Sequence, residues 1–231
     1  MSEIFNKLKN DVINQGLCTH CGTCSGLSNG KIKMKESKFG PIPELIINSG
    51  PLDDIIYNSC PGKGINYPSL VKSLFNSNVT DWRVGHYKDT YIGYSNKDQL
   101  REAGASGGVI TTLLIYLLEN NLIDGAIILK HGSPKPWLAE PIIATTVQQI
   151  KDGAQSVYAP IPVNTIFDKV KSFNGKLAYV GLPDQILSLR YLQNNNIKWS
   201  KKIKYVFGPY VGTNMYSDSI KSFLASNSYR D

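Results

Sequence analysis

The chain has 231 residues, of which 42% are hydrophobic and 19% charged, and this composition is typical of a globular protein with a buried core. Its longest apolar run, 109–118, is shorter than the roughly 20 residues that span a bilayer, so we expect no membrane insertion. The net charge of +7 comes without a recognised nucleic-acid-binding motif, so we expect no nucleic-acid partner either.

The first sixteen residues predict an amphipathic helix rather than a signal peptide. No apolar core or cleavage site follows them, as a secretory signal would require. We therefore expect a cytoplasmic protein whose thiols stay reduced.

Cysteines are the next feature along the chain. Cys18, Cys21 and Cys24 are separated by two residues each, and the remote Cys60 is followed by Pro61. This spacing is the bacterial ferredoxin pattern, in which thiolates hold a four-iron, four-sulfur cluster. The four cysteines are therefore the predicted ligands of one [4Fe-4S] cluster. A zinc ion on the same four thiols is the alternative, although structural zinc sites usually use two separated cysteine pairs.

The segment after the cysteine loop predicts small elements and then a connection. Residues 30–57 have the pattern of short strands and turns, and a short helix is expected over 68–77. The polar stretch 76–91 is typical of a connection between domains. We place the boundary there, with a cluster-binding segment over 1–80 and a second domain over 81–231.

A glycine-rich turn is the most informative feature of the second domain. Residues 90–95 alternate like a strand, and the turn that follows contains Ser106, Gly107 and Gly108. Ser106 is the expected N-cap of a helix that runs to about residue 120. Free N–H groups at such a turn suit a phosphate, with Arg101 and Lys130 as candidate charge partners. The glycines can equally serve close packing, and both interpretations stay open.

Helices and strands alternate along the rest of the chain. Strands are expected over 125–130, 175–183 and the stretch from Ile203, with helices over 165–173 and 184–196. This alternation predicts an α/β domain with a partly parallel, mixed sheet, and an α+β fold for the chain as a whole. The chain lacks the GxGxxG fingerprint of a dinucleotide-binding fold.

Four segments together resemble one family. They are "CTHCGTC" with the later "CPG", "AGASGGVITTLLIYLLENNLIDGAI", "AQSVYAPIPV" and "KLAYVGLPDQI". The chain resembles the beta subunits of coenzyme F420 hydrogenases and dehydrogenases, iron–sulfur flavoproteins related to formate dehydrogenase beta subunits. The resemblance implies an N-terminal cluster-binding segment followed by an α/β domain that binds flavin, FAD or FMN. It also implies that Ser106, Gly107, Gly108 and Tyr158 lie near the flavin, although Tyr158 can equally be an ordinary packed tyrosine.

The chain departs from the family pattern at one position in particular. Asp184 stands in "VGLPDQI" where family members usually have a cysteine, so a second cluster of the kind that some members carry is not expected. We interpret Asp184 as a solvated loop residue or a helix cap rather than a proton-handling group. Family members commonly continue beyond this length, so we expect the second domain to be a trimmed or a reduced version.

These features lead to one expected function and two alternatives. We expect a cytoplasmic oxidoreductase that passes electrons between the cluster, a flavin and a hydride carrier such as coenzyme F420, or a redox partner protein. Assembly with unlike or identical subunits is compatible with this role. The alternatives are an electron-transfer subunit without enzymatic activity, and a zinc-stabilised binding module that has lost redox function.

Overall fold

A four-stranded mixed sheet with helices on both faces forms the larger part of the molecule. The computed structural model describes residues 2–78, 81 and 83–227. The strand order is β4-β3-β5-β6, and the four strands are β3 (Gly125–His131), β4 (Ala139–Ala144), β5 (Leu177–Val180) and β6 (Ile203–Phe207). β3, β5 and β6 are parallel, whereas β4 pairs antiparallel with β3. The predicted mixed sheet is therefore confirmed.

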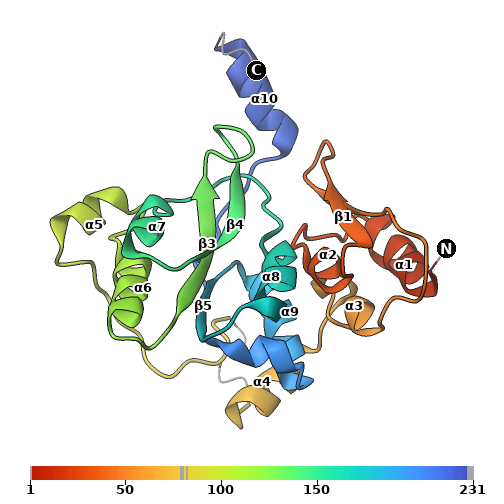
Figure 1. Cartoon of the computed structure of the whole chain (residues 1–231), viewed down its shortest axis with the longest axis horizontal. Helices are drawn as coiled ribbons and strands as arrows, with labels where there is room; N and C mark the ends of the chain where they lie inside the picture. Colours follow the sequence, from red (N-terminus) through yellow and green to blue (C-terminus); the bar gives the residue numbers. More distant parts are fainter. Residues whose placement is uncertain (1, 79–80, 82, 228–231) are drawn as a thin grey trace.

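Two apolar clusters lie on opposite faces of this sheet, because neighbouring residues of a strand point to opposite sides. Ile127 of β3 faces the cluster that includes Phe167, whereas Ile128 faces the cluster that includes Leu114. Figure 1 shows helices α6 and α7 on one side of the sheet and α8 and α9 on the other. The helices on these faces are α5 (Asp98–Ala103), α6 (Val109–Glu119), α7 (Val147–Asp152), α8 (Phe167–Ser172) and α9 (Pro183–Asn194).

The N-terminal segment packs on the side of α8 and α9 that faces away from the sheet (Figure 1). It has its own core, built around Leu8, Ile32 and Ile56. A two-stranded antiparallel sheet, β1 (Ile32–Lys35) with β2 (Ile42–Leu45), covers part of this core. Its helices are α1 (Glu3–Leu8), the π-helical turn η1 (Lys9–Ile13), α2 (Thr23–Leu27), α3 (Ile55–Asn58) and the 3-10 turn η2 (Pro61–Lys63).

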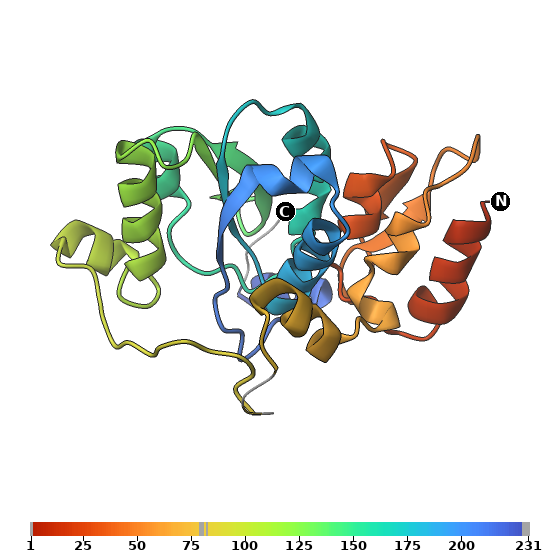
Figure 2. The same cartoon turned by 90° about the horizontal axis from the view of Figure 1, so that it is seen from below.

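A long connection joins the two parts. Helix α4 (Tyr67–Phe75) begins at Asn66, whose side chain accepts a hydrogen bond from the Ser69 amide. From there the chain crosses beneath the molecule to α5 on the far face (Figure 2). The boundary that we placed between residues 80 and 81 stays a prediction, since residues 79–80 and 82 lie outside the described part. The remaining elements are the 3-10 turns η3 (Val163–Ile166) and η4 (Lys198–Lys202) and the helix α10 (Ser217–Ser226).

Three expectations about local structure were wrong. Residues 90–95 are not a strand, because no strand in the described part of the chain pairs with them, and Ile92 is fully exposed. Residues 55–58 form helix α3 instead of a strand or turn. Ser106 is exposed and is not the N-cap of α6, because the chain continues through two left-handed glycines before the helix begins, and Gly108 takes that position.

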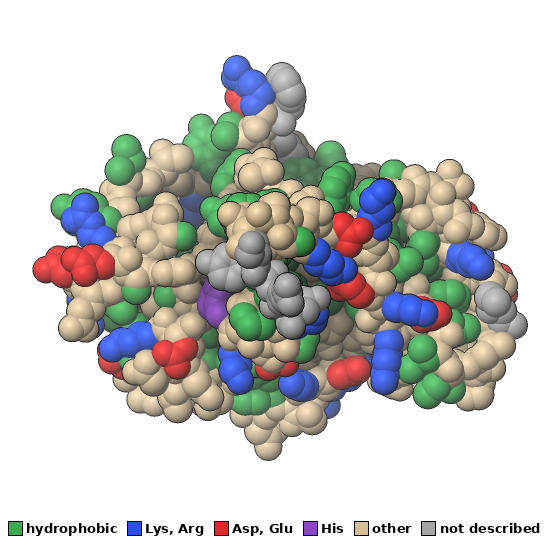
Figure 3. All heavy atoms as spheres, turned by 90° about the horizontal axis from the view of Figure 1, so that it is seen from above, with side chains coloured by type: hydrophobic (Ala, Val, Ile, Leu, Met, Phe, Trp, Pro, Cys, Tyr) green, Lys and Arg blue, Asp and Glu red, His purple; other side chains and the backbone are tan. Residues whose placement is uncertain are grey.

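The distribution of charged side chains on the surface and the length of the helices are the two properties to compare with the composition. Basic and acidic side chains are interspersed over the face shown in Figure 3. Among the described residues, we find no helix with both the length and the hydropathy that a bilayer crossing would require.

Candidate functional site

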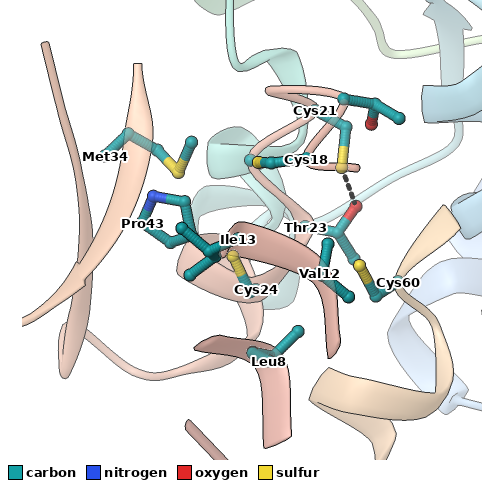
Figure 4. A pocket seen from close by; sticks show the side chains of 12 residues that line it. Leu8, Val12, Ile13, Cys18, Cys21, Thr23, Cys24, Met34, Pro43 and Cys60 are labelled. Atoms are coloured by element: carbon teal, nitrogen blue, oxygen red, sulfur yellow. Dashed lines mark hydrogen bonds between the residues drawn. The ribbon is translucent and has the colours of Figure 1, made fainter. Parts of the chain in front are cut away.

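All four cysteines line one small cavity in the N-terminal segment (Figure 4). Cys18, Cys21 and Cys24 come from the loop that leads into α2, and Cys60 immediately precedes η2. None of the four forms a disulfide. The remaining wall is largely apolar and comes from α1, η1 and the two short strands, with the side chains of Leu8, Val12, Ile13, Met34 and Pro43.

Gly62 allows the turn that follows Cys60 to pack against the cysteine loop. A Cβ atom on Gly62 would lie 2.4 Å from the Leu17 carbonyl oxygen, which is closer than any real contact of this kind. Only glycine therefore lets the η2 turn pack against the residue before Cys18. The backbone N–H groups of Gly62 and Lys63 are also directed at Cys60, where they favour its thiolate.

The cysteine loop is in turn fixed to the larger part of the molecule. Gly22 has a φ of +83°, and a Cβ there would lie 2.8 Å from the Pro162 carbonyl oxygen. A second close approach occurs in α2, where a Cβ on Gly26 would lie 2.1 Å from the Asn164 carbonyl oxygen. Both glycines are therefore required for close packing of the loop on residues 162–165.

A buried hydrogen-bond network centres on Asn164. Its backbone N–H donates to the Cys21 carbonyl oxygen at 2.9 Å, and its Nδ2 donates to Thr23 Oγ1 at 2.8 Å and to the Gln185 carbonyl at 3.1 Å. The Tyr179 hydroxyl donates to Asn164 Oδ1 at 2.5 Å. The residues Thr23, Asn164, Tyr179 and Gln185 are each at most 3% exposed. The network therefore joins the cysteine loop to strand β5 and helix α9.

Burial raises the pKa of each cysteine thiol. The effect is largest at Cys24, where the charges of the other three thiolates add to the loss of hydration. At Cys60 the pKa rises from 9.0 to about 11, again chiefly through burial. Four thiolates in one cavity repel one another, so without a bound cation the thiols stay protonated at neutral pH. A positively charged metal centre would reverse this preference.

Asp184 lies beside the same loop. It belongs to the first turn of α9 and is partly buried, so the expected solvated loop residue is not what the structure shows. Burial raises the pKa of its carboxyl, and a hydrogen bond from the Thr19 side chain opposes that rise. Its charge also acts on Cys18 and Cys21. The position that differs from the family pattern is thus a direct neighbour of the cysteine site.

The glycine-rich turn lies elsewhere, between α5 and α6. A Cβ on Gly108 would lie 2.4 Å from the Leu100 carbonyl oxygen, and one on Gly104 would lie 2.7 Å from the Gly108 nitrogen. Close packing therefore accounts for these two glycines. Nearby, the Arg101 guanidinium stacks on the Tyr94 ring, with its carbon 3.9 Å from the ring centroid.

Two further candidates lie in different elements. Lys130 is exposed near the end of β3, opposite Glu140 of β4. Tyr158 is in the connection between α7 and η3, where 52% of its surface is exposed and its carbonyl oxygen accepts from the Met215 amide. The exposed side chain differs from an ordinary packed tyrosine, and its role near a flavin stays a prediction.

The sequence analysis did not identify Thr23, Asn164 or Tyr179. Thr23 and Asn164 are 141 positions apart, so no local spacing connects them. The one available signal is polarity within otherwise apolar surroundings, such as the asparagine after "PIPV".

Comparison with known proteins shows which proteins this chain is similar to. Residues 90–168 match the family model described as coenzyme F420 hydrogenase/dehydrogenase, beta subunit N-term. The match lies in the sheet-containing part and does not include the cysteine loop. The resemblance inferred from the sequence is confirmed, and the chain is related to these beta subunits.

One relative extends this comparison to nearly the whole chain, and a second covers more than half of it. A coenzyme F420-dependent sulfite reductase of Methanocaldococcus jannaschii is 27% identical over 94% of this chain and 34% of its own length. The coenzyme F420 hydrogenase subunit beta of Methanothermobacter thermautotrophicus is 28% identical over 61% of this chain and 52% of its own length. The chain thus spans about a third to a half of these relatives.

A solved structure shares the fold. A chain of the F420-reducing [NiFe] hydrogenase complex from Methanosarcina barkeri matches with a TM-score of 0.54 and 24% sequence identity. The match covers 63% of this chain and 54% of that chain.

Proposed function

We propose that this chain is an oxidoreductase subunit that holds one [4Fe-4S] cluster on Cys18, Cys21, Cys24 and Cys60. The observation that carries the proposal is that all four thiols, from two separate parts of the sequence, line one largely apolar cavity. When bound, such a cluster takes up and releases single electrons. The protein residues would fix its position, exclude water and supply hydrogen bonds to its sulfur ligands.

The spacing of the cysteines favours a cluster over a zinc ion. Three cysteines separated by two residues each, with a remote cysteine before a proline, follow the ferredoxin pattern, whereas structural zinc sites usually use two separated cysteine pairs.

The relatives supply the rest of the proposal. Their names link them to coenzyme F420, a hydride carrier, and to hydrogenase and sulfite reductase activities. We propose that a flavin, FAD or FMN, binds the sheet-containing part near Ser106, Gly107, Gly108 and Tyr158 and exchanges electrons with the cluster. Hydride would come from or go to a deazaflavin coenzyme or a redox partner protein. The M. barkeri structure is of a multi-subunit complex, which supports an oligomeric partner.

One observation favours a second candidate, an electron-transfer subunit without its own flavin. Two glycines of the turn, Gly104 and Gly108, are required by packing against the Leu100 carbonyl and against each other. Their presence therefore does not by itself demand a phosphate.

The deciding experiment is anaerobic purification followed by measurement of iron, sulfide, zinc and flavin on one sample. About four irons and four sulfides per chain would support the cluster, and stoichiometric flavin would support the first candidate over the second. Zinc without iron or sulfide would overturn both.

A variant tests the ligand assignment. Cys60→Ala should lose most of its iron and sulfide, because the described fold offers this cysteine as the fourth thiol of the cavity. Met34→Leu is the matched control, since Met34 lines the same cavity without being a proposed ligand. Full iron retention in Cys60→Ala would remove Cys60 from the site.

A further inference from the structure

We propose that Thr23 is a positioning residue that donates a hydrogen bond to the Cys21 sulfur, and that a buried chain from Tyr179 through Asn164 fixes the direction of this bond. The inference rests on the proposed function, because the sulfur concerned is that of a proposed cluster ligand. It assigns a role in setting the reduction potential to Thr23, which lies within the cysteine motif, and to Asn164 and Tyr179, which lie outside it.

The direction of the chain follows from the hydrogen-bonding capacity of each group. The Gln185 carbonyl can only accept, and it lies 3.1 Å from one end of the Asn164 amide. That end must therefore be the NH₂ group, and the other end must be the oxygen. The amide orientation is thus set by the backbone of α9.

Each remaining step is then determined. Asn164 Oδ1 can only accept, so the Tyr179 hydroxyl donates to it. Asn164 Nδ2 can only donate, so Thr23 Oγ1 accepts from it. The hydroxyl of Thr23 keeps one hydrogen, and the Cys21 sulfur lies 3.2 Å away (Figure 4). A thiolate has no hydrogen, so in the metal-bound form Thr23 must be the donor.

Burial strengthens the hydrogen bond from Thr23 to the Cys21 sulfur. Thr23 is 2% exposed, and Asn164 and Tyr179 are fully buried, so water does not compete for the donors. A hydrogen bond is electrostatically stronger where the local dielectric is low, and successive bonds in a chain polarise one another. The Tyr179 hydroxyl dipole thus acts on Cys21 through Asn164 and Thr23.

The expected consequence is a higher reduction potential. Reduction adds negative charge that is shared with the cysteine sulfurs, and a hydrogen-bond donor stabilises this charge. Loss of the Thr23 donor should change the ratio of oxidised to reduced cluster about tenfold at a fixed potential, which for one electron corresponds to about 59 mV downward.

The test is a redox titration of anaerobically purified variants, followed by electron paramagnetic resonance. Thr23→Val keeps the shape of the side chain and removes the hydroxyl, whereas Thr23→Ser restores the donor and should restore the potential. Tyr179→Phe removes the first donor of the chain and should lower the potential less than Thr23→Val does. Thr165→Val is the matched control, because the Thr165 hydroxyl donates to the Pro162 carbonyl and not to a sulfur.

Iron and sulfide contents distinguish a failure of the proposed function from a failure of this inference. A wild-type chain without iron and sulfide would refute the proposed function, and this inference with it. Normal cluster content with unchanged potentials in Thr23→Val and Tyr179→Phe would overturn the inference and leave the proposed function intact. If Thr23→Val loses its cluster, Tyr179→Phe decides, since Tyr179 is not among the residues that line the cavity.

Discussion

Replacement of Asn164 by alanine should weaken the attachment of the cysteine loop to the rest of the protein and so lower the free energy of unfolding. The substitution removes the three side-chain hydrogen bonds, to Thr23, Gln185 and Tyr179, and keeps the backbone bond to Cys21. At about 1 kcal/mol for each bond, the loss is about 3 kcal/mol, and the stranded Tyr179 hydroxyl and Gln185 carbonyl raise it toward about 5 kcal/mol.

The assay is thermal unfolding of the anaerobically purified protein, monitored by circular dichroism. For a chain of this length, a loss of 3 kcal/mol lowers the melting temperature by roughly 6 to 12 °C. Asn120→Ala is the matched control, because Asn120 is exposed and its amide bonds only the Tyr116 carbonyl one turn earlier. That control should stay within about 0.5 kcal/mol of the wild type. If Asn164→Ala and Asn120→Ala unfolded within about 1 kcal/mol of each other, the network would not hold the two parts together.

Two further predictions concern the same region. Gly26→Ala should destabilise the protein by more than about 2 kcal/mol in the same melting assay, because the new Cβ would meet the Asn164 carbonyl oxygen. Gly212→Ala is the control and should not destabilise the protein, because a Cβ at Gly212 would have open space. Equal melting temperatures of the two variants would contradict this packing. In cluster-free protein at pH 9, a thiol of pKa about 11 is only about 1% ionised, so Cys60 should react with iodoacetamide about 50-fold more slowly than in urea. Because the folded pKa is the higher one, this thiol contributes stability below about pH 9 that is lost as the pH rises toward 11. Peptide mapping measures the rate, and a difference below about fivefold would mean that Cys60 is not buried as described.

The sequence predicted those features that depend on local spacing. The cysteine pattern with Pro61 indicated one site for four thiols, and the structure places all four around one cavity. The alternation of helix and strand beyond residue 100 likewise indicated β3, β5, β6 and the helices α6, α8 and α9, whereas α7 was not predicted.

Features that depend on distant partners were not predictable in this way. Residues 90–95 have the alternation of a strand, yet no strand lies beside them, so their pattern alone cannot hold them extended in a sheet. Strand β4 contains Pro141 and Glu140, which weaken a strand pattern, and it forms because it lies at the edge of the sheet beside β3. The N-cap of α6 is Gly108 and not the predicted Ser106, because the left-handed turn and its packing on Leu100 determine where α6 can begin.

The distance of 141 positions between Thr23 and Asn164 has a consequence for synthesis of the chain. Ribosomes add about 5 to 20 residues per second, so Thr23 is made roughly 7 to 28 s before Asn164. During that interval the thiols lack the polar neighbours that later enclose them. Iron delivered to the nascent loop would therefore meet a more open site than the finished fold provides.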